Sequence, residues 1–157
     1  MDIRGSRTLD APRAAVFAAI LDPGVLLSVI PGCREIEQVD DSEYRGTISL
    51  RLPGVVGTYR TVVRMIEADA PSFGLLQGEV VGALGSIRGT ASFRLADADG
   101  STSVEYQGRA AIDGPLARLD GRFVESLAGS LIEQGLDSLD ERLRDERTAA
   151  ATPGRPA

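Results

Sequence analysis

From Cys33 to Asp113 the side chains alternate between apolar and polar along the chain. The pattern is clearest in EYRGTISLRL (43–52), TYRTVVRMI (58–66), SIRGTASFRL (86–95) and SVEYQGRAAI (103–112). Successive side chains of a strand point to opposite faces, so this pattern predicts an antiparallel sheet with one covered face and one face in water. Turns near 40–41, 69–71 and 97–100 predict that consecutive strands pair as a meander.

Segments whose apolar residues recur with helical spacing lie on both sides of this region. IRGSRTL (3–9) predicts a first strand, and Asp10 followed by Pro12 predicts a helix whose N-cap is Asp10. Asp22-Pro23-Gly24 ends that helix, and VLLSVI (25–30) predicts a second short one. Residues 116–145 carry a wide apolar stripe that predicts a long helix, and the inner face of the sheet is the large apolar surface it can cover.

Together these elements predict an α+β fold in a single domain, residues 1–146. A curved antiparallel sheet of about seven strands would wrap around the long C-terminal helix, with two short helices after the first strand. Residues 147–157 are small and polar and predict a disordered tail.

Three inward glycines, Gly46, Gly89 and Gly108, favour bending of the sheet and leave space beneath it. We therefore expect an apolar cavity between the sheet and the long helix. The alternative is that the glycines only permit curvature and that side chains fill the interior.

Inward strand positions and the facing helix stripe define the candidate lining of this cavity. The residues predicted to bind a ligand are Tyr44, Ile48, Leu50, Tyr59, Val63, Phe93, Tyr106, Phe123, Leu127 and Leu131. Alternate turns of a meander lie at opposite ends of the sheet, and here one end is acidic while the other is apolar and rich in glycine. The apolar end is predicted to be the cavity mouth, formed by Val55, Val56, Ala83 and Leu84. Alternatively, these four residues pack down onto the helices.

The composition narrows the chemistry that such a cavity can support. The 157 residues are 43% hydrophobic and 25% charged, which fits one globular domain. The chain has no histidine and one cysteine, Cys33, which excludes Ser-His-Asp and Cys-His catalysis and metal sites made of His or several Cys. All 17 basic residues are arginine, which excludes a Schiff-base lysine. The net charge of −6 argues against nucleic acid as a partner, and no cofactor or metal is expected.

Several segments resemble the G-subunit family of carbon-monoxide dehydrogenase, within the superfamily of START lipid-transfer domains, pollen-allergen-like proteins and polyketide cyclases. The resemblance covers residues 1–145 and rests on IRGSRTLDAPRAAVFAAILDP (3–23), VLLSVIPGC (25–33), GVVGTYR (54–60), GSIRGTASFRL (85–95) and YQGRAAIDGPLARL (106–119). It implies a helix-grip fold and an accessory role beside a carbon-monoxide dehydrogenase or a related molybdenum hydroxylase. That role would be maturation, membrane recruitment or quinone delivery, and not catalysis.

Membrane attachment is the point where the chain departs from some members of that family, which end in an apolar anchor. Here RDERTAAATPGRPA (144–157) contains no apolar segment, no run approaches the ~20 residues that cross a bilayer, and MDIRGSRTLD lacks a signal-peptide core. We expect a cytoplasmic protein whose contact with the inner face of the membrane is peripheral and transient.

Three classes of function fit these observations. The first is non-catalytic binding of an apolar small molecule, quinone-like or lipid-like, by an accessory protein. The alternative is an enzyme of the cyclase or hydratase type that uses a cavity tyrosine or Glu79. A third reading is an assembly factor with a filled core. The absence of histidine and the few polar groups expected inside favour the first.

Overall fold

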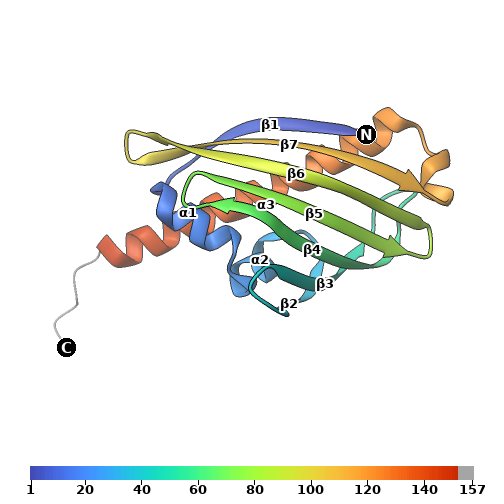
Figure 1. Cartoon of the computed structure of the whole chain (residues 1–157), viewed down its shortest axis with the longest axis horizontal. Coiled ribbons are helices and arrows are strands. Elements are labelled where there is room, and N and C mark those ends of the chain that lie inside the picture. The colour runs from blue at the N-terminus through green and yellow to red at the C-terminus, as the bar shows by residue number, and fades with distance from the viewer. Residues whose placement is uncertain (152–157) are drawn as a thin grey trace.

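The structure, a computed structural model, describes residues 1–151. Within them, seven strands form one antiparallel sheet, and a long helix crosses one face of it (Figure 1). The strands are β1 (Asp2–Leu9), β2 (Cys33–Gln38), β3 (Glu43–Leu50), β4 (Gly57–Asp69), β5 (Phe73–Gly82), β6 (Gly85–Ala98) and β7 (Ser101–Asp113). The helices are α1 (Arg13–Ile20), α2 (Pro23–Val29), the short 3-10 helix η1 (Pro115–Arg118) and α3 (Gly121–Ala151). The predicted fold class is confirmed.

The sheet order is β1-β7-β6-β5-β4-β3-β2, so β2 to β7 form the predicted meander and β1 joins its far side next to β7. The alternating pattern has the predicted consequence: Ile48 of β3 pairs with Tyr59 of β4, and Val80 of β5 pairs with Ile87 of β6. These side chains lie on the face that α3 covers. The period-two pattern therefore determines which side chains can reach the space between sheet and helix.

Of the two acidic residues beside the short helices, Asp22 is an N-cap, whereas Asp10, the predicted one, is not. Asp22 is the N-cap of α2, because its Oδ1 accepts hydrogen bonds from the backbone N–H groups of Gly24 and Val25 at 2.8 and 3.4 Å. Asp10 does not cap α1, which begins after Pro12 without a side-chain cap. The prediction for Asp10 was wrong because its carboxylate binds Arg147 of α3 at 2.8 Å instead.

The C-terminal helix is divided differently from the prediction. Residues 115–118 form η1, and α3 begins after Asp120, whose Oδ1 accepts from the backbone N–H of Arg122 at 2.8 Å. The helix continues to Ala151, so residues 147–151 belong to its last turns and not to a tail. The rest of the predicted tail, residues 152–157, lies outside the described residues.

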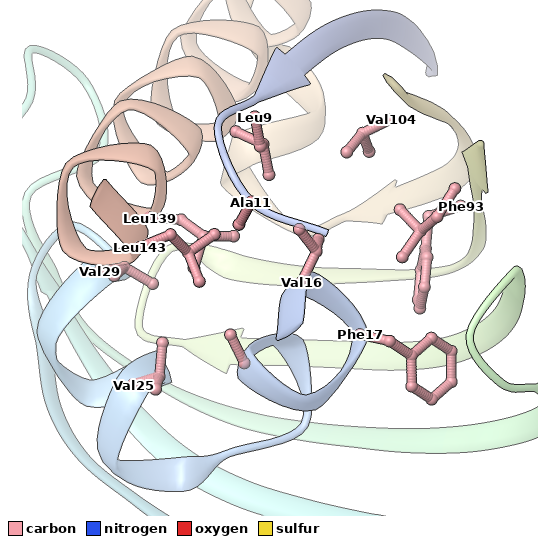
Figure 2. Packing of buried hydrophobic residues seen from close by; sticks show 12 residues of the cluster. Leu9, Ala11, Val16, Phe17, Val25, Val29, Phe93, Val104, Leu139 and Leu143 are labelled. Carbon is pink, nitrogen blue, oxygen red and sulfur yellow. The ribbon is translucent and has the colours of Figure 1, made fainter. Parts of the chain in front are cut away.

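The main core lies where α1, α2 and the C-terminal half of α3 meet the sheet. Leu9 of β1 and Val16 of α1 are completely buried, and Leu139 and Leu143 of α3 pack into the same cluster (Figure 2). Phe17 and Phe93 meet with ring centroids 5.9 Å apart. This end of the molecule is therefore filled, which holds the C-terminal half of α3 close to the sheet.

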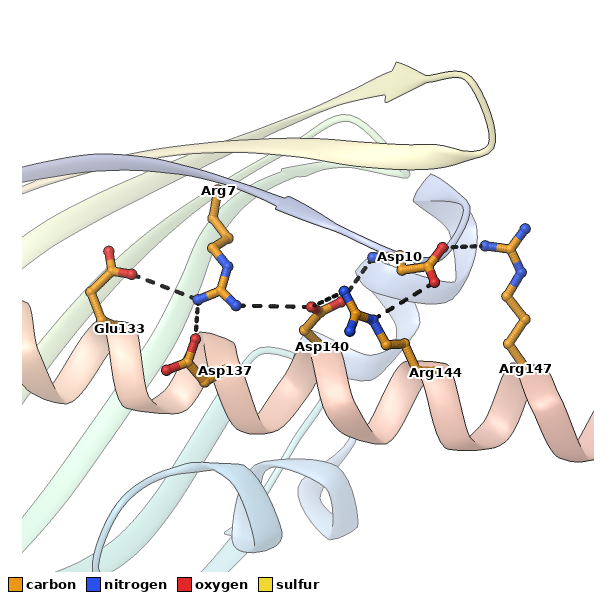
Figure 3. Close-up of polar contacts among 7 residues, drawn as sticks. All are labelled: Arg7, Asp10, Glu133, Asp137, Asp140, Arg144 and Arg147. Atoms are coloured by element: carbon orange, nitrogen blue, oxygen red, sulfur yellow. Dashed lines mark hydrogen bonds and ion pairs between the residues drawn. The ribbon is translucent and has the colours of Figure 1, made fainter.

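A charged seam joins the middle and the C-terminal half of α3 to β1 (Figure 3). Arg7 comes from the inner face of β1 and lies among three carboxylates of α3: it is hydrogen-bonded to Asp137, 3.7 Å from Glu133 and 3.8 Å from Asp140. The Oδ1 of Asp140 also accepts from the backbone N–H of Asp10 at 2.9 Å. Exposed ion pairs contribute little one by one, but these share partners and fix the position of α3 along β1.

Thr102 offers a test of how β7 is joined to the segment between β1 and α1. Its side chain is fully buried, and its hydroxyl donates to the backbone carbonyl of Ala11 at 2.7 Å. Replacing Thr102 with Val leaves that carbonyl without a partner, so we expect a loss of about 1–2 kcal/mol in the free energy of unfolding. Urea denaturation measures it. Thr90→Val, at an exposed position of β6, is the control and should change stability little.

Glu43 gives a stability difference that depends on pH. Its buried carboxylate accepts hydrogen bonds from Arg64 at 2.5 Å and from Arg45 at 2.8 Å, and these two guanidinium groups hold the pKa of Glu43 below its usual value. The stabilisation is therefore present above the unfolded-state pKa of about 4.3 and is lost as the pH falls through the lowered pKa. Urea midpoints of the wild type and Glu43→Gln should differ at pH 7 and converge in acid. An equal difference at both pH values would contradict this assignment.

Candidate ligand-binding cavity

An apolar cavity of about 430 Å³ lies between α3, α2 and the inner face of the sheet. Its volume falls in the range of small-molecule sites. None of the described residues that line it is charged, and the single side-chain hydroxyl among them belongs to Tyr59. The lining residues are Leu26, Val29, Ile30, Pro31, Ile48, Leu50, Leu52, Val55, Tyr59, Val80, Ile87, Leu116, Val124, Leu127, Ala128, Leu131, Ile132, Gly135, Leu136 and Leu139.

Five parts of the chain supply this lining. The helical spacing of α3 turns the stripe from Val124 to Leu139 toward the cavity. The strands β3 to β6 contribute inward side chains, and the segment Leu26 to Pro31 closes the side next to β2. The loop between β3 and β4 adds Leu52 and Val55, and η1 adds Leu116. The walls therefore come from segments far apart in sequence, which only the tertiary fold brings together.

Tyr59 shows how the sheet leaves this space open. A Cβ atom at Gly82, on the neighbouring strand β5, would lie 2.6 Å from the Tyr59 ring, so the ring can rest against the sheet only because residue 82 is glycine. The Tyr59 hydroxyl donates to the backbone carbonyl of Val55 at 3.1 Å. Both features keep the tyrosine along the wall and leave its polar atom occupied by the protein.

Clusters of apolar side chains lie at both ends of the cavity. The main core lies at the α1 end, and a smaller cluster of Val55, Tyr59 and Leu116 lies at the end where the β3–β4 loop meets η1. Leu84 and Leu119 are half-buried and pack against the smaller cluster. The cavity is thus the space that remains between two well-packed regions.

The titratable groups nearby are poorly placed for acid–base chemistry. Burial raises the pKa of Tyr44, Tyr59 and Tyr106, so these phenols stay protonated at neutral pH. Glu79 lies on the outer face, half-exposed and 3.4 Å from Arg88. Burial also raises the pKa of Cys33, whose Sγ lies 3.5 Å from the carbonyl oxygen of Glu35. Within residues 1–151 no group of three or more His, Cys, Asp or Glu side chains is arranged to hold a metal ion.

A family model that describes the G subunit of carbon monoxide dehydrogenase (CoxG) matches residues 5–144. The chain belongs to the CoxG family. The resemblance seen in the sequence is therefore confirmed, over nearly the whole domain. No curated protein matches the chain by sequence.

Solved structures show the same fold at low identity. A conserved protein from Geobacillus kaustophilus is 20% identical with a TM-score of 0.88, over 92% of this chain and 96% of that one. A START superfamily protein from Mycobacterium smegmatis is 12% identical with a TM-score of 0.72, over 92% and 97%. A protein from Chromobacterium violaceum is 18% identical with a TM-score of 0.69, over 89% and 95%. The CoxG-family chain therefore has a START-like fold.

Half of the residues predicted to bind a ligand line the cavity. Five lie in its wall: Ile48, Leu50, Tyr59, Leu127 and Leu131. Tyr44, Val63, Phe93, Tyr106 and Phe123 lie outside it. Tyr44 and Tyr106 share the inner face but direct their hydroxyls to protein groups, the carbonyl of Leu21 at 2.6 Å and Glu133 at 2.9 Å.

The other three residues lie outside the cavity wall for different reasons. Phe93 belongs to the main core, where it packs against Phe17. Val63 and Phe123 are half-buried; Val63 lies further along β4 than Tyr59, and Phe123 lies one turn before Leu127 on α3. Sequence reasoning missed the segment Leu26 to Pro31, whose signal was the apolar run VLLSVIP in a helix too short to be buried by itself.

The four predicted mouth residues divide into two pairs. Val55 is 8% exposed and lines the cavity, and Leu84 is half-buried against the smaller cluster, so these two pack inward. Val56 is 62% exposed and Ala83 is also exposed, so these two face solvent at the same end of the sheet. In the part of the chain that the structure describes, no helix has the length and hydropathy to cross a membrane.

Proposed function

We propose that this chain binds an uncharged apolar small molecule, quinone-like or lipid-like, in the cavity and releases it unchanged. The observation that carries the proposal is the lining itself: twenty residues without a charge, whose one side-chain hydroxyl is already bonded to Val55. Such a surface gains free energy by excluding water and offers no directional contact that would select a polar ligand.

The magnitude of this effect is sufficient for a carrier. Each methylene group removed from water contributes about 0.8 kcal/mol, so about ten of them contribute ~8 kcal/mol, which corresponds to micromolar affinity before the costs of association. An affinity of that order keeps an apolar molecule bound to the protein in aqueous solution and still permits its release.

The enzyme alternative has little support from the geometry. A cyclase or hydratase needs an acid or base in contact with its substrate. Glu79 lies on the opposite face of the sheet, and the hydroxyls of Tyr44, Tyr59 and Tyr106 bind protein groups. The cavity also counts against an assembly factor with a filled core.

Membership of the CoxG family supports the rest of the proposal. The chain serves as an accessory protein to a carbon-monoxide dehydrogenase or a related molybdenum hydroxylase, in maturation, membrane recruitment or quinone delivery. Exposed Val56 and Ala83, at the apolar end of the sheet, are suited to brief contact with a membrane surface.

Filling the cavity tests the binding proposal. Ala128 lines the cavity, and Ala128→Phe puts a ring into the space that a ligand would occupy. Organic extraction and mass spectrometry of the wild type should yield an apolar compound, and Ala128→Phe should lower uptake of Nile red or farnesol at least about tenfold, equal to about 1.4 kcal/mol. Ala111→Phe, the same change at an exposed position of β7, is the control. Equal uptake by both variants would refute the proposal.

Membrane contact is tested at Val56. Burying an aspartate in an apolar interface is unfavourable, so Val56→Asp should reduce recovery of the protein with anionic liposomes in a flotation assay. Val39→Asp makes the same change at another exposed valine, in the turn between β2 and β3 at the acidic end of the sheet. If the two variants float equally well, Val56 is not part of a membrane contact.

A further inference from the structure

The N-terminal half of α3 is attached to the edge of the sheet at two separate points. Glu125 accepts a hydrogen bond from the backbone N–H of Asp2 on β1 at 3.2 Å, and Glu133 accepts one from the Tyr106 hydroxyl of β7 at 2.9 Å. Eight residues separate them, so the two attachments are about 12 Å apart along the helix. Gly129 lies four residues from each and therefore faces the same two strands.

Nothing lies close to Gly129 on that side. A Cβ atom built there would have no atom within 4 Å beyond its own helix turn and chain neighbours. A helix packed against a sheet normally fills this distance with side chains, because protein interiors are close-packed. Between its two attachments, α3 therefore has open space at the Cβ position of Gly129, which we call the gap.

The sheet opposite this part of α3 is lined by small residues. On the inner face, Gly89 of β6 pairs with Ala110 of β7, and Ala91 pairs with Gly108. Ala91 is exposed, although it shares its face with buried Phe93 and with Ile87 of the cavity wall, and no bulge interrupts β6 between them. An exposed alanine on the covered face means that solvent reaches beneath the sheet.

The gap lies next to residues of the cavity wall. Ile132 and Leu136 both line the cavity, and they follow Gly129 by three and seven residues, on the same side of α3. Ile87, which also lines the cavity, lies on β6 two positions before Gly89. The space beside Gly129 and the space inside the cavity are thus neighbours under the same helix.

We propose that the gap between α3 and the strands β1 and β7, framed by Glu125, Gly129 and Glu133, is the portal through which the ligand enters and leaves the cavity. This proposal rests on the proposed function. It differs from the predicted mouth, since Val55 and Leu84 pack inward at that end.

The rim of the portal also limits the class of ligand. Two carboxylates, those of Glu125 and Glu133, lie at its edges, and the nearby Arg7 is shared with Asp137 and Asp140. A negatively charged head group would be repelled here, whereas an uncharged one can remain hydrated at the rim while its apolar chain lies in the cavity. The portal therefore fits uncharged single-chain molecules better than fatty-acid anions.

Closing the portal tests the proposal. Gly129→Phe places a ring in the gap, and it should not harm the helix, since glycine is among the least favourable helix residues. Gly121→Phe is the matched control, because Gly121 also has open space at its Cβ position but lies at the exposed start of α3. Stopped-flow fluorescence measures the association of Nile red, an uncharged dye, and a chase with excess farnesol measures its dissociation.

We expect Gly129→Phe to slow association and dissociation by a similar factor, about tenfold or more, with little change in Kd, while Gly121→Phe behaves as the wild type. Gly129→Leu is a smaller substitution for the case that the phenylalanine variant does not fold. Rates within twofold of the wild type would overturn the portal, as would unchanged association with faster dissociation, which would make residue 129 part of the binding surface. Failure of the wild type to take up Nile red or farnesol would instead refute the proposed function.

Discussion

The attachment of α3 to the sheet at its C-terminal half is the constraint on which the rest of the structure depends. Leu139 and Leu143 enter the main core, and Arg7 of β1 reaches the acidic residues beside them. The hydrophobic contacts supply the stabilisation, while the charged seam sets the position of the helix along β1. Because a helix is stiff, fixing one half also determines how far the other half stands from the sheet.

The N-terminal half of α3 is held in a different way. It has hydrogen bonds at Glu125 and Glu133 and apolar contacts with the loop between β3 and β4, but small residues face it across much of the sheet. A helix held over such a surface cannot fill the space beneath it. The apolar cavity lies next to this part of α3, and its walls carry no charged side chain among the described residues of this CoxG-family chain.

The fold could be predicted largely from the sequence, and the candidate site only in part. Alternation in β3, β4, β6 and β7 indicates which residues face α3, and Ile48, Leu50 and Tyr59 are inward positions for that reason. Facing inward, however, is not the same as lining the cavity. Phe93 and Tyr106 face inward as well, but Phe93 packs in the main core and the Tyr106 hydroxyl donates a hydrogen bond to Glu133.

The sequence by itself determined local features: the hydrophobic periodicity of each element, the turns between elements and the inner face of the sheet. Its composition also excluded several kinds of catalytic and metal site. All of these follow from neighbouring residues or from residue counts. The tertiary structure alone decided where space remains. In the sequence Asp10 resembles a helix cap, but in the structure it binds Arg147 of α3. In the sequence Gly129 is only an unfavourable helix residue, but in the structure its Cβ position faces open space. An empty volume is bounded by residues far apart in the chain, and no local pattern records the distance between them.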